Sequence, residues 1–481
     1  MGLLQIGASI LTSLLIGALT RGALRTYLLL ALSILAVYWF QPLLPLRSFD
    51  FWLPSLSLAL TVLTWFITSQ TGIHANAGSS TWHSRTNLTG LFIIIGLTTT
   101  IDLSRYFLPE PFLTATTPPQ FTQYFIFVSI LALAILFLTW LSNHRTWTLT
   151  ATIILLIAIL LILKTPALSQ QASIFFRMLA NRPVENVSFT DLRWLGFSYI
   201  AFRLIHVLRD KQMGRLPELT LPEFATYVVF FPSLAAGPID RAERFAQDLR
   251  KDFALTQAET LLGGQRIALG LFKKFVIADA LALIALSDAL ATQVRTTGWM
   301  WIIVYAYTFQ IYFDFSGYTD IAIGIARLAG IKLPENFAAP YSRPNLTQFW
   351  NNWHMTLTQW FRSYFFNPFN RWMRGHRNIP AWIMIFMGQL GTMLLIGLWH
   401  GVTFNFILWG LWHGLGLFLQ NRWSDFIRVR YPNIGQNARL QPALQLGGAL
   451  LTFHFVALGW VFFALSEPFL SRQVFMKLFG M

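Results

Sequence analysis

The stretch PAWIMIFMGQLGTMLLIGLWH, residues 380–400, decides the fold class of this chain of 481 residues. It contains no acidic residue, lysine or arginine, and about 20 mostly apolar residues suffice to cross a bilayer as a helix. Comparable stretches lie near residues 2–20, 26–45, 51–69, 87–101, 121–142, 147–163, 191–208, 261–289, 299–326, 404–420 and 445–465. The pattern predicts an all-α polytopic membrane protein with about 11–13 transmembrane or re-entrant helices.

The composition agrees with this fold class. Hydrophobic residues make up 55% of the chain and charged residues only 11%, whereas soluble domains carry about 25% charge. The net charge of +15 comes from basic residues clustered in short loops, which fits the positive-inside rule and argues against a nucleic-acid partner. Arg21 and Arg25 in the first loop, with the basic loop 371–377, predict an outer N-terminus and cytoplasmic basic loops. The chain has no cysteine, which excludes an acyl-cysteine intermediate.

Two features divide the chain. Segment 224–238 contains Pro232, Gly237 and Pro238, and we interpret it as a re-entrant or broken segment, which is stable at membrane depth only when protein buries it. Nearly all polar side chains expected inside the membrane follow residue 185. We therefore expect N-terminal transmembrane helices of unassigned role in residues 1–185, and the chemistry in residues 186–481.

The stretch NLTQFWNNWHMTLTQWFRSY, residues 345–364, predicts one amphipathic helix at a membrane surface or cavity wall. Asn345 followed by Gln348 resembles a capping box at its start. One face is apolar and aromatic, and comprises Leu346, Phe349, Trp350, Trp353, Leu357, Trp360, Phe361 and Tyr364. A second stripe is polar, and comprises Thr347, Asn351, His354, Thr358 and Arg362. Either this stripe simply faces water, or His354 has a chemical role.

His400 is a candidate functional residue because an ionisable side chain inside a spanning segment is costly and usually functional. Gly397 and Gly401 flank it, so another backbone or a substrate can approach closely. The alternative is a neutral imidazole that bonds a carbonyl of a neighbouring helix. His413 lies roughly 220° further around the helix, so we expect it to be structural and we predict no metal site.

Two aspartates, Asp314 and Asp320, fall in one predicted span. Arg327, two turns from Asp320 on the same helical face, is an available partner, and buried ion pairing is the favoured interpretation. Gly317 and Gly324 on this span predict a small-residue seam for close helix packing.

Four stretches carry a resemblance to a known family. They are FFPSLAAGPIDR (230–241), DFSGYTDIAIGIARLAG (314–330), PYSRPNLTQFWNNWHMTLTQWFRSYFF (340–366) and GLWHG (397–401). Over about residues 190–465 the chain resembles the membrane-bound O-acyltransferase superfamily. The similarity is to the bacterial branch of alginate O-acetylation and teichoic-acid D-alanyl transfer proteins.

The resemblance implies a ring of tilted helices around a central tunnel, with the catalytic core in residues 186–481. It places the family's histidine at His400 and its second polar residue at His354. His400 would deprotonate an acceptor hydroxyl, because imidazole is a suitable base near neutral pH. His354 would orient the donor, polarise its carbonyl or relay the proton. The predicted substrate contacts are Asn351, Trp353, Trp399 and Thr358.

The implied reaction moves an acyl group, most simply acetyl, from a cytoplasmic thioester to a hydroxyl of an extracytoplasmic polysaccharide or cell-wall glycan. No cofactor stays bound, since the donor, acetyl-CoA or an acyl carrier, is a co-substrate that would enter near Arg371, Arg374 and Arg377. The expected partners are a periplasmic acetyltransferase-like protein or an acyl carrier protein, and the expected location is the bacterial cytoplasmic membrane. The alternatives are D-alanyl transfer to teichoic acid, a proton-coupled transporter using Asp314, Asp320 and His400, and a non-catalytic scaffold.

Overall fold

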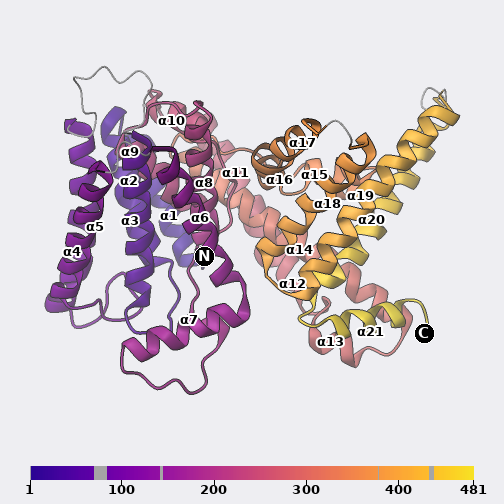
Figure 1. Cartoon of the computed structure of the whole chain (residues 1–481), viewed down its shortest axis with the longest axis horizontal. Coiled ribbons are helices and arrows are strands. Elements are labelled where there is room, and N and C mark those ends of the chain that lie inside the picture. Colours follow the sequence, from indigo (N-terminus) through magenta and orange to yellow (C-terminus); the bar gives the residue numbers. More distant parts are fainter. Residues whose placement is uncertain (1, 70–83, 141–144, 377–378, 433–437) are drawn as a thin grey trace. The chain divides into compact units, whose positions relative to one another are not determined.

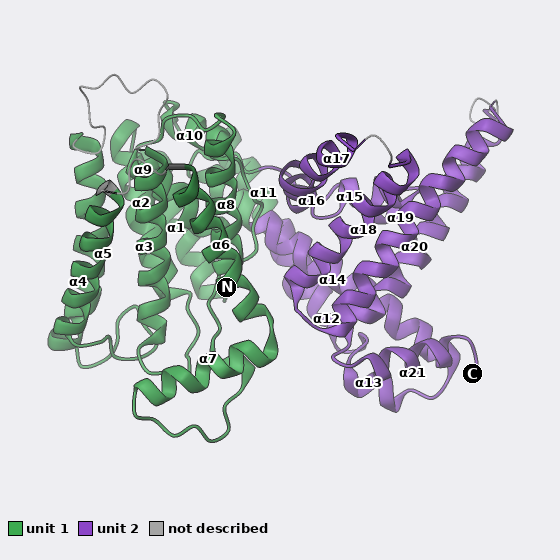
Figure 2. Cartoon of the chain, viewed as in Figure 1, with its two compact units in different colours: residues 1–267, 322–333 green, residues 268–321, 334–481 purple. Residues whose placement is uncertain are grey.

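The fold was analysed in a computed structural model that describes residues 2–69, 84–140, 145–376, 379–432 and 438–481 (Figure 1). These residues form helices and connecting turns, without a β-strand among them. They divide into two compact units (Figure 2): unit 1 holds residues 1–267 and 322–333, and unit 2 holds residues 268–321 and 334–481. The division of roles near residue 185 stays a prediction.

Seven helices in the described ranges are long and apolar enough to cross a membrane, which confirms the all-α polytopic class. The spans are Gly22–Trp39, Phe49–Ser69, Arg85–Phe107, Phe121–Leu138, Thr146–Lys164, Ala381–His400 and Gln441–Ala464.

Unit 1 is built around α3, a helix that is buried along most of its length. Helices α2, α5, α6, α8 and α9 pack against it. The helices of this unit are α1 (Leu3–Leu19), α2 (Gly22–Trp39), α3 (Phe49–Ser69), α4 (Arg85–Phe107), α5 (Phe121–Trp140), α6 (Arg145–Lys164), α7 (Pro166–Leu179), α8 (Phe197–Gln212), α9 (Leu221–Val229) and α10 (Ala242–Arg250).

Arg25 corrects one expectation, because it is not a charge of a solvated loop. Helix α2 begins at Gly22, and the Arg25 side chain is fully buried. Its Nη2 donates to the backbone oxygens of Asp248, Leu249 and Lys251 at 2.6, 2.9 and 3.1 Å. The guanidinium thus satisfies carbonyls at the C-terminus of α10, where unpaired acceptors and negative helix-dipole charge favour a cation. The predicted orientation of the chain stays a prediction.

The segment 224–238 is broken and buried within unit 1, as predicted from its prolines. Helix α9 ends at Val229 and a 3₁₀ turn, η4 (Phe231–Ser233), follows. Buried Arg203 donates to the Val228 oxygen at 2.7 Å, and to the backbone and hydroxyl oxygens of Ser233 at 2.8 and 2.6 Å. These bonds satisfy carbonyls that the broken helix leaves without partners.

Helix α14 carries the predicted small-residue seam. Its partner is α11 with the π-helical turn η5 that continues it. A Cβ atom on Gly317 would lie 2.8 Å from the Gly270 oxygen, and one on Gly324 would lie 2.8 Å from the Gly263 oxygen. The two backbones therefore touch, which confirms the seam. The elements from Gln257 to Leu328 are α11 (Gln257–Leu271), η5 (Phe272–Ala278), α12 (Asp279–Ala282), α13 (Asp288–Gln293) and α14 (Thr297–Leu328).

The predicted span 261–289 ends earlier than expected. Helix α12 stops at Ala282, and the Ser287 hydroxyl then caps α13 by accepting from the Leu290 backbone N–H at 3.3 Å. A capping serine starts a new helix because it satisfies one of the free N–H groups of the first turn.

Both aspartates of α14 form ion pairs, but neither pairs with Arg327. The Asp320 pair is largely buried, as favoured, whereas the Asp314 side chain is 48% exposed. Lys273 bonds Asp320 at 2.7 Å and Lys274 bonds Asp314 at 2.5 Å. Arg327 instead pairs with Glu259. The lysines come from η5, which close glycine packing brings against α14.

The rest of unit 2 contains the two motif stretches with the candidate histidines. Helices α18 and α19 pack along each other, and α20 packs on α19 (Figure 1). The elements are α15 (Leu346–Asn352), α16 (Met355–Phe361), η7 (Arg362–Phe366), α17 (Asn367–Arg374), α18 (Ala381–His400), α19 (Phe404–Arg430), α20 (Gln441–Ala464) and α21 (Pro468–Leu478).

Candidate active site

His400 is the last residue of α18 and lies at the turn of a tight helical hairpin. A Cβ atom on Gly397 would lie 2.4 Å from the Phe406 backbone oxygen, and one on Gly410 would lie 2.9 Å from the Met393 oxygen. Glycines therefore let α18 and α19 approach at backbone contact, as expected for Gly397. The hairpin fixes where the imidazole of His400 is placed.

The half-buried His400 ring packs among aromatic side chains of unit 2. Its centroid lies 4.5 Å from that of Trp399, 4.7 Å from Phe463, and 5.9 Å from both Phe406 and Trp409. Such rings supply an apolar wall along these sides of the imidazole, and they hold it in place.

His354 lies at a break between two short helices, so the single predicted helix over 345–364 was wrong. Helix α15 ends at Asn352, and His354 has a φ of 42° before α16 begins. A left-handed conformation costs a non-glycine residue about 1–2 kcal/mol, and such strain persists where surrounding structure enforces it. The predicted cap is present, since Asn345 Oδ1 accepts from the Gln348 backbone N–H at 2.9 Å.

The loop around Asn336 enforces this break. The Asn336 backbone oxygen accepts from the Met355 N–H at 2.9 Å, and the Ala338 N–H donates to the Asn352 oxygen at 3.1 Å. The loop thereby bonds backbone groups on both sides of His354. Hydrogen bonds on each side offset the cost of the left-handed residue.

His354 is buried beside polar and aromatic side chains, Asn336 and Phe315 among them. Its side chain is 3% exposed, so the interpretation of a water-facing stripe is wrong for this residue. Burial lowers the pKa of His354 to about 3, which keeps the imidazole neutral at physiological pH. Its Nδ1 lies 3.2 Å from Asn336 Oδ1, whereas Nε2 is buried and has no hydrogen-bond partner among the described residues.

The Trp399 ring is a neighbour of both histidines. Its ring centroid lies 6.3 Å from that of His354 and 4.5 Å from that of His400. Both imidazoles therefore contact one indole, although 46 residues separate them in the sequence.

The other predicted contacts differ in their surroundings. Asn351 is exposed, and its Oδ1 accepts from Arg362 Nη2 at 2.5 Å. Trp353 is 4% exposed and stacks on Phe349 at 5.6 Å, so it packs in the aromatic core. Thr358 is half-buried and donates to the Trp353 oxygen at 3.4 Å. Of the four, Trp399 is the residue that contacts both histidines.

The remaining expectations concern charged and buried groups. Arg371 and Arg374 are exposed on α17, and Arg377 lies outside the described residues.

His413 is fully buried among Trp350, Trp409 and Trp460, and neither ring nitrogen has a hydrogen-bond partner in the described chain. Within the described ranges no group of three or more histidine, aspartate or glutamate side chains could hold a metal ion.

Asn336 is the residue of this site that sequence reasoning missed. It is completely buried and makes the contact to His354, yet its spacing follows no pattern of the neighbouring helices. Only its occurrence shortly before the motif 340–366 could have drawn attention to it.

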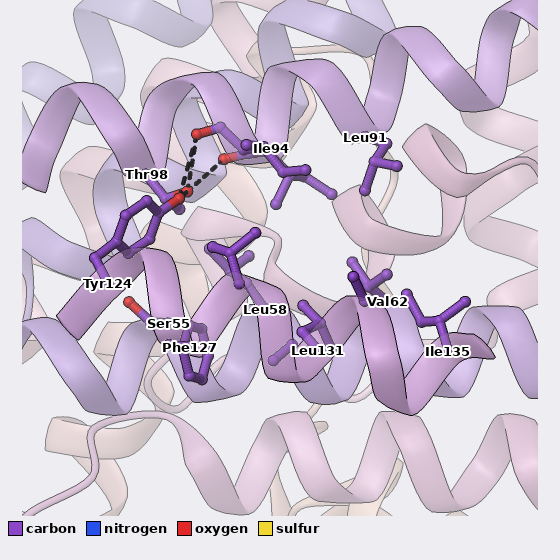
Figure 3. A pocket seen from close by; sticks show the side chains of 14 residues that line it. Ser55, Leu58, Val62, Leu91, Ile94, Thr98, Tyr124, Phe127, Leu131 and Ile135 are labelled. Atoms are coloured by element: carbon purple, nitrogen blue, oxygen red, sulfur yellow. Dashed lines mark hydrogen bonds between the residues drawn. The ribbon is translucent and has the colours of Figure 1, made fainter. Parts of the chain in front are cut away.

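A separate cavity of about 120 Å³ lies in unit 1 between α3, α4 and α5 (Figure 3). Its walls are apolar except for the hydroxyls of Ser55, Thr98 and Tyr124, and the last two are 2.6 Å apart. The wall carries no histidine, acid or amine, so it offers no base for acyl transfer.

Comparison with known proteins matches most of this chain to one family. The model of the membrane-bound O-acyltransferase family matches residues 125–453. The match begins well before residue 190, so the family region extends further toward the N-terminus than the motifs indicated.

Several curated proteins are similar to this chain. A teichoic acid D-alanyltransferase of Bacillus subtilis is 32% identical over 58% of this chain and 70% of its own length. A probable alginate O-acetylase of Pseudomonas aeruginosa is 34% identical over 60% of this chain and 51% of its own length. A peptidoglycan O-acetyltransferase of Helicobacter pylori is 36% identical over 58% of this chain and 53% of its own length. With its apolar helices and this match to the family model, the chain belongs to the membrane-bound O-acyltransferase family and is a multi-pass membrane O-acyltransferase.

Proposed function

We propose that this chain moves an acetyl group from a cytoplasmic thioester to a hydroxyl of an extracytoplasmic polysaccharide or cell-wall glycan. The observation that carries the proposal is the contact of His354 and His400 with one Trp399 ring. Two similar proteins are named a probable alginate O-acetylase and a peptidoglycan O-acetyltransferase. These names support acetyl as the acyl group and a glycan as the acceptor.

In the proposed reaction His400 is the general base. The acceptor oxygen attacks the thioester carbonyl carbon while its proton moves to the His400 imidazole. The C–S bond then breaks, the new ester forms, and the leaving thiolate takes up the proton as a thiol. The chain has no cysteine, so no acyl-cysteine intermediate forms, and we propose direct transfer from the thioester to the acceptor. The donor is a co-substrate, and no bound cofactor takes part.

The donor is proposed to enter on the cytoplasmic side near Arg371 and Arg374. Both side chains are exposed on α17, where guanidinium groups suit the phosphates of CoA or of a carrier protein. We propose the bacterial cytoplasmic membrane as the location. A periplasmic acetyltransferase-like protein or an acyl carrier protein is the proposed partner.

D-alanyl transfer to teichoic acid is the second candidate. The similarity to the Bacillus subtilis D-alanyltransferase, which extends over 70% of that protein, favours it. A proton-coupled transporter is less favoured, because Asp314 and Asp320 are each neutralised by a lysine.

The test compares purified wild type with His400→Ala in labelled acyl transfer. Acetyl-CoA and a D-alanyl carrier protein are the donors, and alginate, peptidoglycan fragments and teichoic acid are the acceptors. We expect the variant to lose about 100-fold or more of the rate, the size of a general-base contribution. His454→Ala is the matched control, since His454 lies in the same unit, partly exposed and bonded to the Leu450 oxygen.

Normal transfer by His400→Ala would overturn the assignment of the base. If the wild type accepts only the D-alanyl donor, D-alanyl transfer to teichoic acid replaces acetyl transfer as the function. Proton-coupled solute flux without acyl transfer would overturn the proposed reaction.

A further inference from the structure

The side-chain oxygen of Asn336 is an acceptor for three donors. The Thr356 backbone N–H lies 3.2 Å from Oδ1, the Thr356 hydroxyl lies 2.9 Å away, and His354 Nδ1 lies 3.2 Å away. A backbone N–H can only donate, so the amide atom that faces it must be the oxygen. This contact fixes the orientation of the Asn336 amide without reference to the histidine.

The orientation of the amide decides the tautomer of His354. Because Oδ1 can only accept, the Nδ1 atom that bonds it must carry the hydrogen. A neutral imidazole has one N–H, so Nε2 holds a lone pair. That Nε2 is buried and has no hydrogen-bond partner in the described part of the chain, which leaves an acceptor available for a ligand.

We propose that Asn336 is a positioning residue that fixes His354 in the Nδ1–H tautomer, so that Nε2 accepts a hydrogen bond from a hydroxyl of the acceptor glycan. In this tautomer Nε2 does not donate, so His354 does not polarise the thioester carbonyl. The reacting hydroxyl gives its single proton to His400, so the hydroxyl that His354 binds is a neighbouring one that orients the sugar. The kinetic part of this inference rests on the proposed function.

The strained backbone of His354 agrees with this role. The left-handed turn at His354 directs its side chain to Asn336. The backbone oxygen of Asn336 also accepts from the N–H of Met355, the residue that follows His354. Phe315 packs edge-on against the imidazole with centroids 4.7 Å apart. The ring is therefore held by one hydrogen bond at Nδ1 and by aromatic contacts, and its Nε2 edge is left for a ligand.

The first measurement is ¹⁵N NMR of the histidine-labelled full chain in lipid nanodiscs. The His354 signals are assigned by their absence in His354→Gln. We expect a neutral ring with the proton on Nδ1. A proton on Nε2, or on both nitrogens, would overturn the proposal. This measurement needs no substrate, so it decides the tautomer even if the chain does not transfer acetyl groups.

The second measurement separates a positioning role from a structural one. Asn336→Leu removes the oxygen that accepts from His354 Nδ1, so we expect a mixture of His354 tautomers. The KM for the glycan should rise about tenfold, the size expected for the loss of one hydrogen bond, while the KM for the thioester donor stays unchanged. Asn336→Asp keeps the oxygen and should retain the proton on Nδ1. Thr356→Val is the matched control, because it removes another bond to the same Oδ1 but leaves the contact to His354.

Two results of the second measurement would overturn the proposal. One is an Asn336→Leu variant that keeps the Nδ1–H tautomer and the wild-type acceptor KM. The other is a Thr356→Val variant that changes the tautomer and the acceptor KM as much as Asn336→Leu does, because then general packing of the turn sets both.

Discussion

The substitution Gly397→Ala tests whether the α18–α19 hairpin positions His400. The added Cβ atom would lie 2.4 Å from the Phe406 backbone oxygen, and the obstacle is backbone, which has no alternative rotamer. Restoring ordinary van der Waals separation requires a shift of about 1 Å. The Phe406 ring stacks on His400 with centroids 5.9 Å apart, so the shift reaches the imidazole.

We expect Gly397→Ala to lose little stability but much of the acyl-transfer rate. Overpacking costs about 1–3 kcal/mol, whereas exchanging glycine for alanine inside a helix returns about 1 kcal/mol. The net destabilisation is therefore about 2 kcal/mol or less. A displacement of about 1 Å at a reacting group can lower the rate about 100-fold.

The assay measures labelled acyl transfer and the midpoint of thermal unfolding on the same preparations. Gly391→Ala is the matched control in the same helix, because its Cβ would lie 3.3 Å from the end of the Phe365 ring, which can give way. We expect Gly391→Ala to keep the rate. Wild-type activity in Gly397→Ala, or an equal loss in the control, would refute the positioning of His400 by the hairpin.

Three further predictions concern buried polar groups. His413→Leu should keep the thermal midpoint and most of the transfer rate, because the replaced ring nitrogens are buried and have no hydrogen-bond partner among the described residues. A loss of rate with an intact fold would contradict the structural role of His413. Asp320→Asn leaves the partly buried Lys273 without its carboxylate partner, which should lower the free energy of unfolding by about 3–5 kcal/mol. Adding Lys273→Met to the same chain should restore much of the thermal midpoint. Burial raises the pKa of Glu223, but hydrogen bonds from Arg250 and its charge outweigh burial and lower it. The stability that this pair contributes is therefore complete above the unfolded-state pKa of Glu223 and is lost as the pH falls through its folded-state pKa. In thermal melts over a series of pH values, acid should lower the midpoint of wild type more steeply than that of Glu223→Gln.

Local sequence predicted which stretches are helical and which faces are buried, but it did not predict the break at His354 or the ion-pair partner of Asp320. The apolar face of 345–364 is buried as its spacing indicated, since Phe349, Trp350 and Trp353 are at most 6% exposed. The glycine seam of α14 was also predictable, because small residues at helical spacing mark close packing. The partner of Asp320 was not, since Lys273 lies 47 residues away on another helix.

The sequence by itself determined that the chain is a helical membrane protein, and its motifs identified His354 and His400. Apolar length and helical spacing are local properties, so a stretch of sequence is enough to read them. Only the tertiary structure decided that the chain breaks at His354 and that Asn336, 18 residues earlier, bonds its ring. A left-handed residue is unfavourable by its own local energetics, and here bonds from the Asn336 loop, a segment outside the helices, stabilise it.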